Sequence, residues 1–167
     1  LTIGYPDKTM VSDIDFQVNK NDRVAIIGPN GIGKSTLLKT IMKKLEPKDG
    51  SIKYGASLDI GYYDQELQSL DPSKTVLDTI WDRHKTMPEK DVRSILASFL
   101  FTAEDIDKTV GQLSGGQKAR LTLTVLSLEK DNFLLMDEPT NHLDIEAKEV
   151  LEQALDTYDG TLLFVSH

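Results

Sequence analysis

The sequence predicts an α/β fold, with a mostly parallel sheet, antiparallel strands near the amino terminus and a small helical subdomain in the middle. Two observations predict it. Short apolar runs at 23–27, 133–136 and 161–165 have the length of buried strands. Between these runs, apolar residues recur every three or four positions, which is the spacing of amphipathic helices. Strands that alternate with helices along a chain are typical of a parallel sheet.

The amino-terminal segment alternates between apolar and polar residues. Leu1 and Ile3, and then Ile14, Phe16 and Val18, follow the period of half-buried strands. The elements expected next are a turn at 19–22, a strand at 23–27, a helix from Lys34 whose apolar stripe reaches Leu45, and short strands at 52–54 and 58–62.

The middle of the chain is predicted to form the helical subdomain, over about 70–128. Two apolar stripes, at 76–81 and 92–100, are separated by Pro88. The pair Gly115-Gly116 opens a further helix that runs to about Leu128. The remaining expected elements are a buried strand at 133–136, an amphipathic helix at 145–158 that Gly160 stops, and a strand at 161–165.

The length and composition fit one globular domain, which we assign to residues 1–167. The chain has no cysteine, which excludes disulfides, thiolate metal sites and a cysteine nucleophile. Its aliphatic runs are far shorter than the roughly 20 residues that a membrane helix needs, so direct membrane insertion is not expected. A net charge of -8 disfavours a primary role as a nucleic-acid clamp.

Both ends of the chain look cut. Residue 1 is leucine rather than an initiator methionine, and no signal peptide is visible. The last residue, His167, directly follows the predicted strand at 161–165. We therefore expect a domain truncated at both ends that belongs to a longer cytoplasmic protein.

A glycine-rich segment between the predicted strand at 23–27 and the following helix matches the pattern G-x-x-x-x-G-K-[ST]. Glycines let successive backbone N–H groups point at a polyphosphate, and the positive end of the helix adds to the attraction. Lys34 would reach the β and γ phosphates, and the Ser35 hydroxyl would bind Mg²⁺. The competing interpretation is a glycine-rich turn with an exposed lysine. The matching residues are Gly28, Pro29, Asn30, Gly31, Ile32, Gly33, Lys34 and Ser35.

Two acidic residues, Asp137 and Glu138, end the predicted strand at 133–136. Ligands of open α/β sheets bind at the carboxyl ends of the strands, and adjacent residues of a strand point to opposite sides. Asp137 suits the Mg²⁺ shell, directly or through water. Glu138 suits a base or an orienting group for an attacking water. Taken alone, the pair could be merely solvated, and the phosphate-binding pattern favours the catalytic interpretation.

The segment Leu113-Ser114-Gly115-Gly116-Gln117 places a serine and two glycines at a predicted helix start. Such a start is a ready anion site, although helix capping alone would explain Ser114. Two glycines cost the helix about 1 kcal/mol each relative to alanine. Their use is close approach of the backbone to a ligand.

Together these segments resemble the ATP-binding cassette (ABC) family. The phosphate loop, Gln65, the segment 113–117, the pair Asp137-Glu138 and His167 occur in the order of that family, and the resemblance covers essentially the whole chain. It implies a P-loop NTPase fold that binds ATP and Mg²⁺. It also implies a head-to-tail pair of cassettes, in the same parent chain or as a homodimer, in which ATP on one phosphate loop is closed by the signature (113–117) of the other.

The resemblance assigns roles to single residues. Tyr5, in the loop after the first strand, resembles the aromatic residue that stacks on adenine, and Asp144 resembles the residue of the loop that communicates between the two sites. Gln65 resembles the glutamine that contacts Mg²⁺ and the attacking water, and His167 the histidine that contacts the γ phosphate. The expected catalytic residues are Glu138, Lys34, Gln65 and His167, and the metal ligands are Ser35, Gln65 and Asp137. The expected nucleotide-binding residues are Tyr5, Gly28, Pro29, Asn30, Gly31, Ile32, Gly33, Lys34, Ser35, Thr36, Ser114, Gly115, Gly116 and Gln117.

Three segments are similar to the soluble ABC-F proteins, whose members hold two cassettes in one chain and act on ribosomes. They are the phosphate loop, Gly61-Tyr62-Tyr63-Asp64-Gln65 and Asn141-His142-Leu143-Asp144, while Lys118-Ala119-Arg120 resembles the second cassette. Thr122, Thr124 and Ser127 depart from the small apolar residues of many relatives. The resemblance implies an ATPase of translation or antibiotic resistance. Two alternatives stay open: a nucleotide-binding subunit of an ABC membrane transporter, and a nucleotide-gated binding module with vestigial catalysis.

Overall fold

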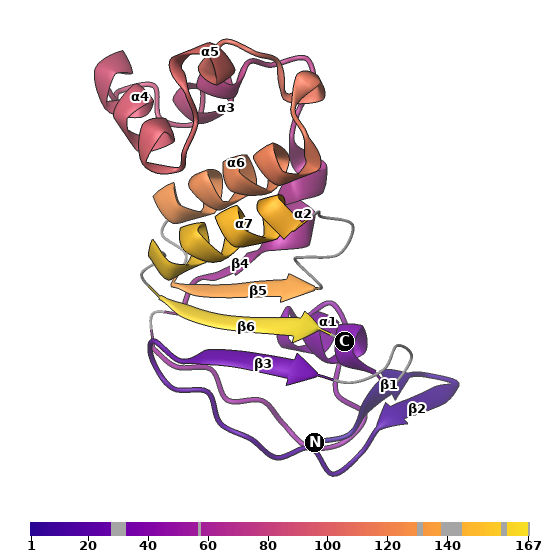
Figure 1. The fold of residues 1–167 in the computed structure, drawn as a ribbon. Helices are drawn as coiled ribbons and strands as arrows, with labels where there is room; N and C mark the ends of the chain where they lie inside the picture. The colour runs from indigo at the N-terminus through magenta and orange to yellow at the C-terminus, as the bar shows by residue number, and fades with distance from the viewer. Residues whose placement is uncertain (28–32, 57, 130–131, 138–144, 158–159, 167) are drawn as a thin grey trace. The chain divides into compact units, whose positions relative to one another are not determined.

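The computed structural model describes residues 1–27, 33–56, 58–129, 132–137, 145–157 and 160–166 (Figure 1). The chain divides into two compact units. We call the first the sheet unit; it comprises Leu1–Tyr62, Asp131–Pro139 and Asp159–His167. We call the second the helical unit; it comprises Tyr63–Lys130 and Thr140–Tyr158.

A four-stranded parallel sheet forms the centre of the sheet unit (Figure 1). The two inner strands are shielded from solvent at Leu134, Leu135, Met136 and Leu163, as expected for parallel strands. The sequence prediction of a mostly parallel sheet is therefore confirmed. In spatial order the strands are β3 (Arg23–Ile27), β6 (Thr161–Ser166), β5 (Phe133–Asp137) and β4 (Ile60–Tyr62).

An antiparallel hairpin lies at the amino terminus of the sheet unit, formed by β1 (Ile3–Tyr5) and β2 (Lys8–Val11). The expected strand through Ile14, Phe16 and Val18 is wrong. Asp13 adopts a left-handed conformation, with φ 59°, which ends the extended run. Within residues 14–18, the backbone hydrogen bonds of the described structure are those of Ile14, whose N–H donates to the Leu1 carbonyl and whose carbonyl accepts from the amino terminus of Leu1. An alternating pattern predicts a half-buried face but does not supply a partner strand.

The strands expected at 52–54 and 58–62 are also corrected by the structure. The first is not a strand, because Tyr54 is held by its side chain instead: its hydroxyl donates to the Ile41 carbonyl at 2.7 Å and its ring lies under Lys43. The second is shortened to β4, whose residues 60–62 are in parallel register with residues 133–135 of β5.

The helix that follows the phosphate loop, α1 (Lys34–Ile41), is shorter than its apolar stripe predicts. It ends before Leu45 because Lys43 is left-handed, with φ 64°, and a residue in that conformation cannot continue the helix. Leu37, Leu38 and Ile41 form the core of the sheet unit together with side chains of β1, β5 and β6. This packing fixes the start of α1 against the sheet.

The helical unit has a core of its own, in which Val76, Ile80, Val92, Leu96 and Leu121 are fully buried. The predicted helix of 115–128 is confirmed at both ends, and Pro88 precedes a helix as expected. Two short helices were not predicted, because α2 lacks an apolar stripe and α5 is a single turn. The elements are α2 (Tyr63–Ser69), α3 (Val76–Trp81), α4 (Glu89–Ser98), α5 (Ala103–Ile106), the 3-10 helix η1 (Val110–Gln112), α6 (Gly115–Leu128) and α7 (Ile145–Thr157).

Within the described ranges, every helix is too short or too polar to cross a bilayer.

Candidate functional site

The start of α1 is built from backbone alone. Its N-cap is Gly33, with φ 102°, and among the described residues no side chain caps the first turn. A Cβ atom at Gly33 would lie 2.6 Å from Cγ2 of Val11, so β2 approaches this glycine too closely for any side chain. A helix start without a side-chain cap is the arrangement in which proteins bind phosphate. The other residues predicted for the phosphate loop, Gly28 to Ile32, lie outside the described residues.

The first turn of α1 carries Lys34, Ser35 and Thr36. Lys34 is only 7% exposed and Thr36 is buried, whereas Ser35 is exposed. The competing interpretation of this segment, a glycine-rich turn with an exposed lysine, is therefore wrong. Burial lowers the local dielectric around the ammonium group, which strengthens its attraction for an anion.

Ser35 and Asp137 meet, although they are far apart in the sequence. The Ser35 hydroxyl donates a hydrogen bond to Asp137 Oδ2 at 2.8 Å, and the pair is exposed. Ser35 comes from the first turn of α1 and Asp137 from the carboxyl end of β5. Hydroxyl and carboxylate oxygens are the hard donors that Mg²⁺ prefers. This pair is therefore chemically suited to hold Mg²⁺ beside a triphosphate.

The other residues expected around the triphosphate are placed only in part. Tyr5 is the last residue of β1 and half-buried, not in the loop after the strand as predicted. Gln65 lies in α2, and its side chain is outside the described residues. Glu138, Asp144 and His167 also lie outside the described residues.

The signature lies at the start of α6, in the helical unit, where Ser114 and Gly115 are exposed. Ser114 is the N-cap, and its Oγ accepts the Gln117 N–H at 3.2 Å, while the Ser114 N–H donates to Gln117 Oε1 at 3.0 Å. This reciprocal pair is a capping box. Because Ser114 Oγ acts as an acceptor there, its own hydrogen can be donated outward, and no described residue accepts it. Gly115 is exposed beside it, and Gly116 is half-buried.

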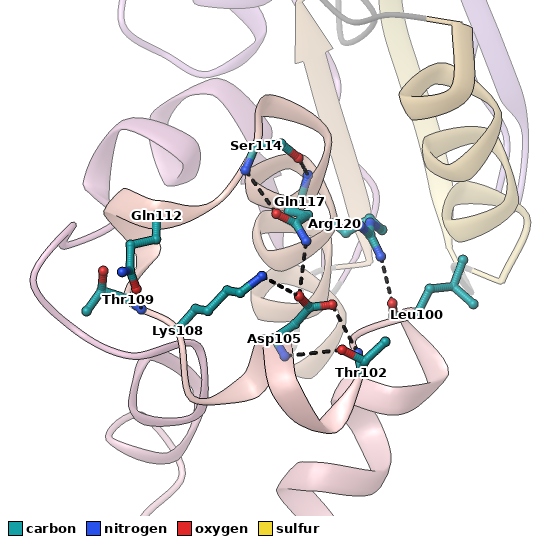
Figure 2. A network of polar contacts seen from close by, with 9 residues as sticks. All are labelled: Leu100, Thr102, Asp105, Lys108, Thr109, Gln112, Ser114, Gln117 and Arg120. Carbon is teal, nitrogen blue, oxygen red and sulfur yellow. Dashed lines mark hydrogen bonds and ion pairs between the residues drawn. The ribbon is translucent and has the colours of Figure 1, made fainter.

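A cluster of polar residues supports the signature (Figure 2). Asp105 Oδ1 accepts hydrogen bonds from Gln117 Nε2 at 3.4 Å and from Lys108 Nζ at 3.1 Å. The hydrogen bonds from Lys108 and then Thr102 hold the pKa of the Asp105 carboxyl below its usual range. Sequence reasoning missed Asp105. The pattern Thr102-x-x-Asp105, itself a capping box, was the signal that could have found it.

Arg120 attaches the same helix to the segment before α5. Its guanidinium donates to the Leu100 carbonyl at 2.8 Å and lies over the ring of Phe101, 5.1 Å from the centroid. Leu100 is left-handed, with φ 69°, a conformation that costs a residue with a side chain about 1–2 kcal/mol. Burial lowers the pKa of Arg120. The hydrogen bond and the ring contact of Arg120 therefore hold the strained turn at Leu100 beside α6.

Of the three polar residues that depart from many relatives, Thr122 and Thr124 lie in the buried part of α6, whereas Ser127 is exposed. Thr122 and Thr124 are 0% exposed, and each hydroxyl donates to the carbonyl four residues earlier at 2.8 Å. The Ser127 hydroxyl donates to the carbonyl of Thr124. Because the hydroxyls of Thr122 and Thr124 are satisfied within their own helix, both residues occupy the core without a hydrogen-bond partner from another element.

Residues 11–141 match the ABC transporter family, so the chain belongs to that family. It is 53% identical to YdiF of Bacillus subtilis (strain 168), over all of this chain and 26% of that protein. It is 43% identical to the ATP-binding protein Uup of Escherichia coli (strain K12), over 96% of this chain and 26% of Uup. It is 38% identical to ABC transporter F family member 5 of Arabidopsis thaliana, over 100% of this chain and 24% of that protein. The chain thus spans about a quarter of the length of these relatives.

Two solved structures share the fold. A Pyrococcus furiosus protein described as an ABC transporter ATP-binding protein is 26% identical, with a TM-score of 0.83, over 100% of this chain and 88% of its own. The ATP-binding cassette MJ0796 is 23% identical, with a TM-score of 0.74, over 99% of this chain and 84% of its own. The second structure is a dimer in a post-hydrolysis state, bound to ADP and Pi. The predicted ABC cassette fold is confirmed.

Proposed function

We propose that this chain is an ATP-binding and ATP-hydrolysing cassette of an ABC-F type protein, and that it works in the cytoplasm as one of a pair of cassettes. The observation that carries the proposal is the contact between Ser35 and Asp137 at the uncapped start of α1. That contact brings a hydroxyl and a carboxylate, the oxygen donors of a magnesium nucleotide site, to the end of a phosphate-binding pattern.

The residues of the sheet unit would bind and orient the triphosphate. Lys34 would pair with the β and γ phosphates, and Ser35 and Asp137 would hold Mg²⁺ together with Gln65. When bound, the ion neutralises charge that develops on the transferred phosphoryl group. Glu138 would orient and deprotonate the attacking water, and His167 would contact the γ phosphate. Tyr5 would stack on the adenine.

The residues of the helical unit would complete the site of the paired cassette. The outward hydrogen of the Ser114 hydroxyl would be donated to a γ phosphate oxygen of ATP bound by the partner. Gly115 and Gly116 would let the helix start approach that phosphate closely. ATP binding would thus close the pair, and hydrolysis would release it. The dimeric state of MJ0796 with ADP and Pi supports this pairing.

The similarity to an ABC transporter F family member supports the ABC-F assignment. We further propose a two-cassette parent protein that acts on the ribosome, in translation or antibiotic resistance. Because this chain carries a net charge of -8, contacts with RNA would come mainly from other segments of the parent protein. The alternative is a nucleotide-binding subunit of an ABC membrane transporter. Co-purification of the full-length protein with ribosomes rather than with a membrane protein would decide between the two.

Two variants of the full-length protein test the assigned chemistry. With Glu138→Gln, we expect ATP to stay bound in a closed pair of cassettes, because water is no longer activated. With Lys34→Ala, we expect nucleotide binding to be lost, because the cation facing the phosphates is gone. The measurement is the amount of ATP that co-elutes with each variant in gel filtration, together with the rate of phosphate release. Normal phosphate release by both variants would contradict the assigned roles.

A further inference from the structure

Gln117 makes three hydrogen bonds at the start of α6, two of which fix its side chain. Its backbone N–H and its Oε1 form the capping box with Ser114, and its Nε2 donates to Asp105 Oδ1 at 3.4 Å (Figure 2). If the amide turned over, its NH₂ group would face the Ser114 N–H and its oxygen would face a carboxylate. Both contacts would be repulsive. Asp105 therefore permits one orientation of the Gln117 amide, the one that caps Ser114.

Asp105 is itself held rigidly. Lys108 Nζ lies 3.1 Å from Oδ1, and the Thr102 N–H donates to Oδ2 at 3.3 Å. The Asp105 N–H in turn donates to Thr102 Oγ1 at 3.2 Å. The Asp105 side chain is 14% exposed, so most of it is removed from solvent. A carboxylate fixed by its neighbours in this way can fix a further group, as supporting residues of functional sites do.

A second capping box in the same unit provides an internal comparison. The Thr109 N–H donates to Gln112 Oε1 at 3.0 Å, as the Ser114 N–H does to Gln117 (Figure 2). Among the described residues, however, nothing accepts a hydrogen bond from Nε2 of Gln112. A glutamine can therefore form a capping box without a carboxylate that accepts a hydrogen bond from its Nε2. The contact with Asp105 is an addition found at the signature and absent from the box at Thr109.

We propose that Asp105 is a positioning residue for the signature: it holds the Gln117 amide, and Gln117 holds Ser114 so that the serine hydroxyl faces the nucleotide of the paired cassette. The inference rests on the proposed function, since it assigns Ser114 to the ATP of a partner. Asp105 touches no nucleotide. It acts through the geometry of Ser114, and a displacement of about 1 Å in such a site can cost up to about 100-fold in rate.

The test uses the full-length protein with Glu138→Gln, labelled with a donor and an acceptor dye on its two cassettes. The measured quantity is the ATP concentration that gives half-maximal closure. We expect Asp105→Ala to raise it about tenfold. Thr102→Ala removes the side-chain cap of α5 but leaves the acceptor for Gln117, and we expect a change of less than twofold. Asp105→Asn keeps an acceptor oxygen, and we expect it to restore closure to within about threefold.

The outcomes distinguish failure of the proposed function from failure of the positioning role of Asp105. If the Glu138→Gln protein does not close with ATP, the proposed function fails. If it closes and Asp105→Ala shifts the midpoint no further than Thr102→Ala does, the positioning role is overturned. If Asp105→Ala does not fold, Asp105→Ser replaces it. Serine keeps an acceptor for the Thr102 N–H but is too short to reach Gln117, so the same tenfold increase is expected, and an unchanged midpoint would overturn the proposal.

Discussion

The helix starts of α1 and α6 are capped in different ways. At α1 the N-cap is Gly33, which offers no side chain, whereas at α6 the N-cap is Ser114, which is paired reciprocally with Gln117. The first helix start thus presents main chain to a ligand. The second satisfies its main chain internally and presents a hydroxyl hydrogen. Under the proposed function, one anion site is thus built from the backbone of a helix start and the other from a pre-oriented side chain.

The largest expected effect is at the backbone-built start. Gly33→Ala places a Cβ at φ 102° and within 2.6 Å of the Val11 side chain. We expect a loss of about 1–3 kcal/mol in the free energy of unfolding, from left-handed strain and displacement of β2. Nucleotide binding should also be lost, because the first turn of α1 moves. Denaturant unfolding and ATP titration measure the two effects.

The matched control is Gly55→Ala. Gly55 has open space around it and no positive φ, so alanine should change the free energy of unfolding by less than about 0.5 kcal/mol. Equal effects of the two substitutions would show that the conformation of Gly33 is not required for the phosphate-binding start of α1.

The next effect concerns Ser35 and Asp137, the metal ligands proposed beside that start. Ser35→Ala removes the hydroxyl that contacts Asp137. We expect the Mg²⁺ concentration needed for ATP binding to rise about tenfold, because one hard oxygen donor is lost. Stability should change little, since the pair is exposed. Titration of Mg²⁺ at fixed ATP measures the shift. Ser94→Ala, which removes an exposed hydroxyl from α4, should leave the midpoint where it is.

At the side-chain-built start, Ser114→Gly separates the cap from the ligand. Glycine is a good N-cap, so the free energy of unfolding should fall by only a few tenths of a kcal/mol. The donated hydroxyl is lost, however, and we expect ATP-dependent closure of the Glu138→Gln protein to weaken by about tenfold or more. Thr75→Gly is the control, since it removes the side-chain cap of α3, in which Thr75 Oγ1 accepts the Asp78 N–H. Weakened closure in both variants would mean that capping alone explains Ser114.

Some parts of the fold and of the candidate site could be predicted from the sequence, and others could not. Buried strands and the helix of 115–128 were predictable because their apolar period and end signals are local. The strand predicted through Phe16 does not form, because strand pairing depends on a partner strand that an alternating sequence pattern does not reveal. In the site, the pattern predicts Ser35 and Asp137 as companions, and the structure places them in contact. Asp105 was not predicted as a site residue, because its contact with Gln117 joins two helices whose relative placement depends on tertiary packing.

The smallest expected effect is a pH dependence at the signature support. Hydrogen bonds from Lys108 and Thr102 lower the pKa of Asp105 in the folded protein. Its stabilising contribution is therefore complete above the ordinary carboxyl pKa of about 3.9 and is lost as the pH falls through the lower folded value. Asp105→Asn should melt at a lower temperature than the unsubstituted protein at pH 5, and the gap should narrow below pH 4. Thermal melts at a series of pH values measure the gap.

Asp71→Asn is the control. Ser73 lowers the pKa of Asp71 in the same direction, so the difference in melting temperature should also narrow, but Asp71→Asn should not alter the ATP dependence of closure. A gap for Asp105→Asn that stayed constant down to pH 3 would mean that the charge of Asp105 contributes nothing to the cluster behind Gln117.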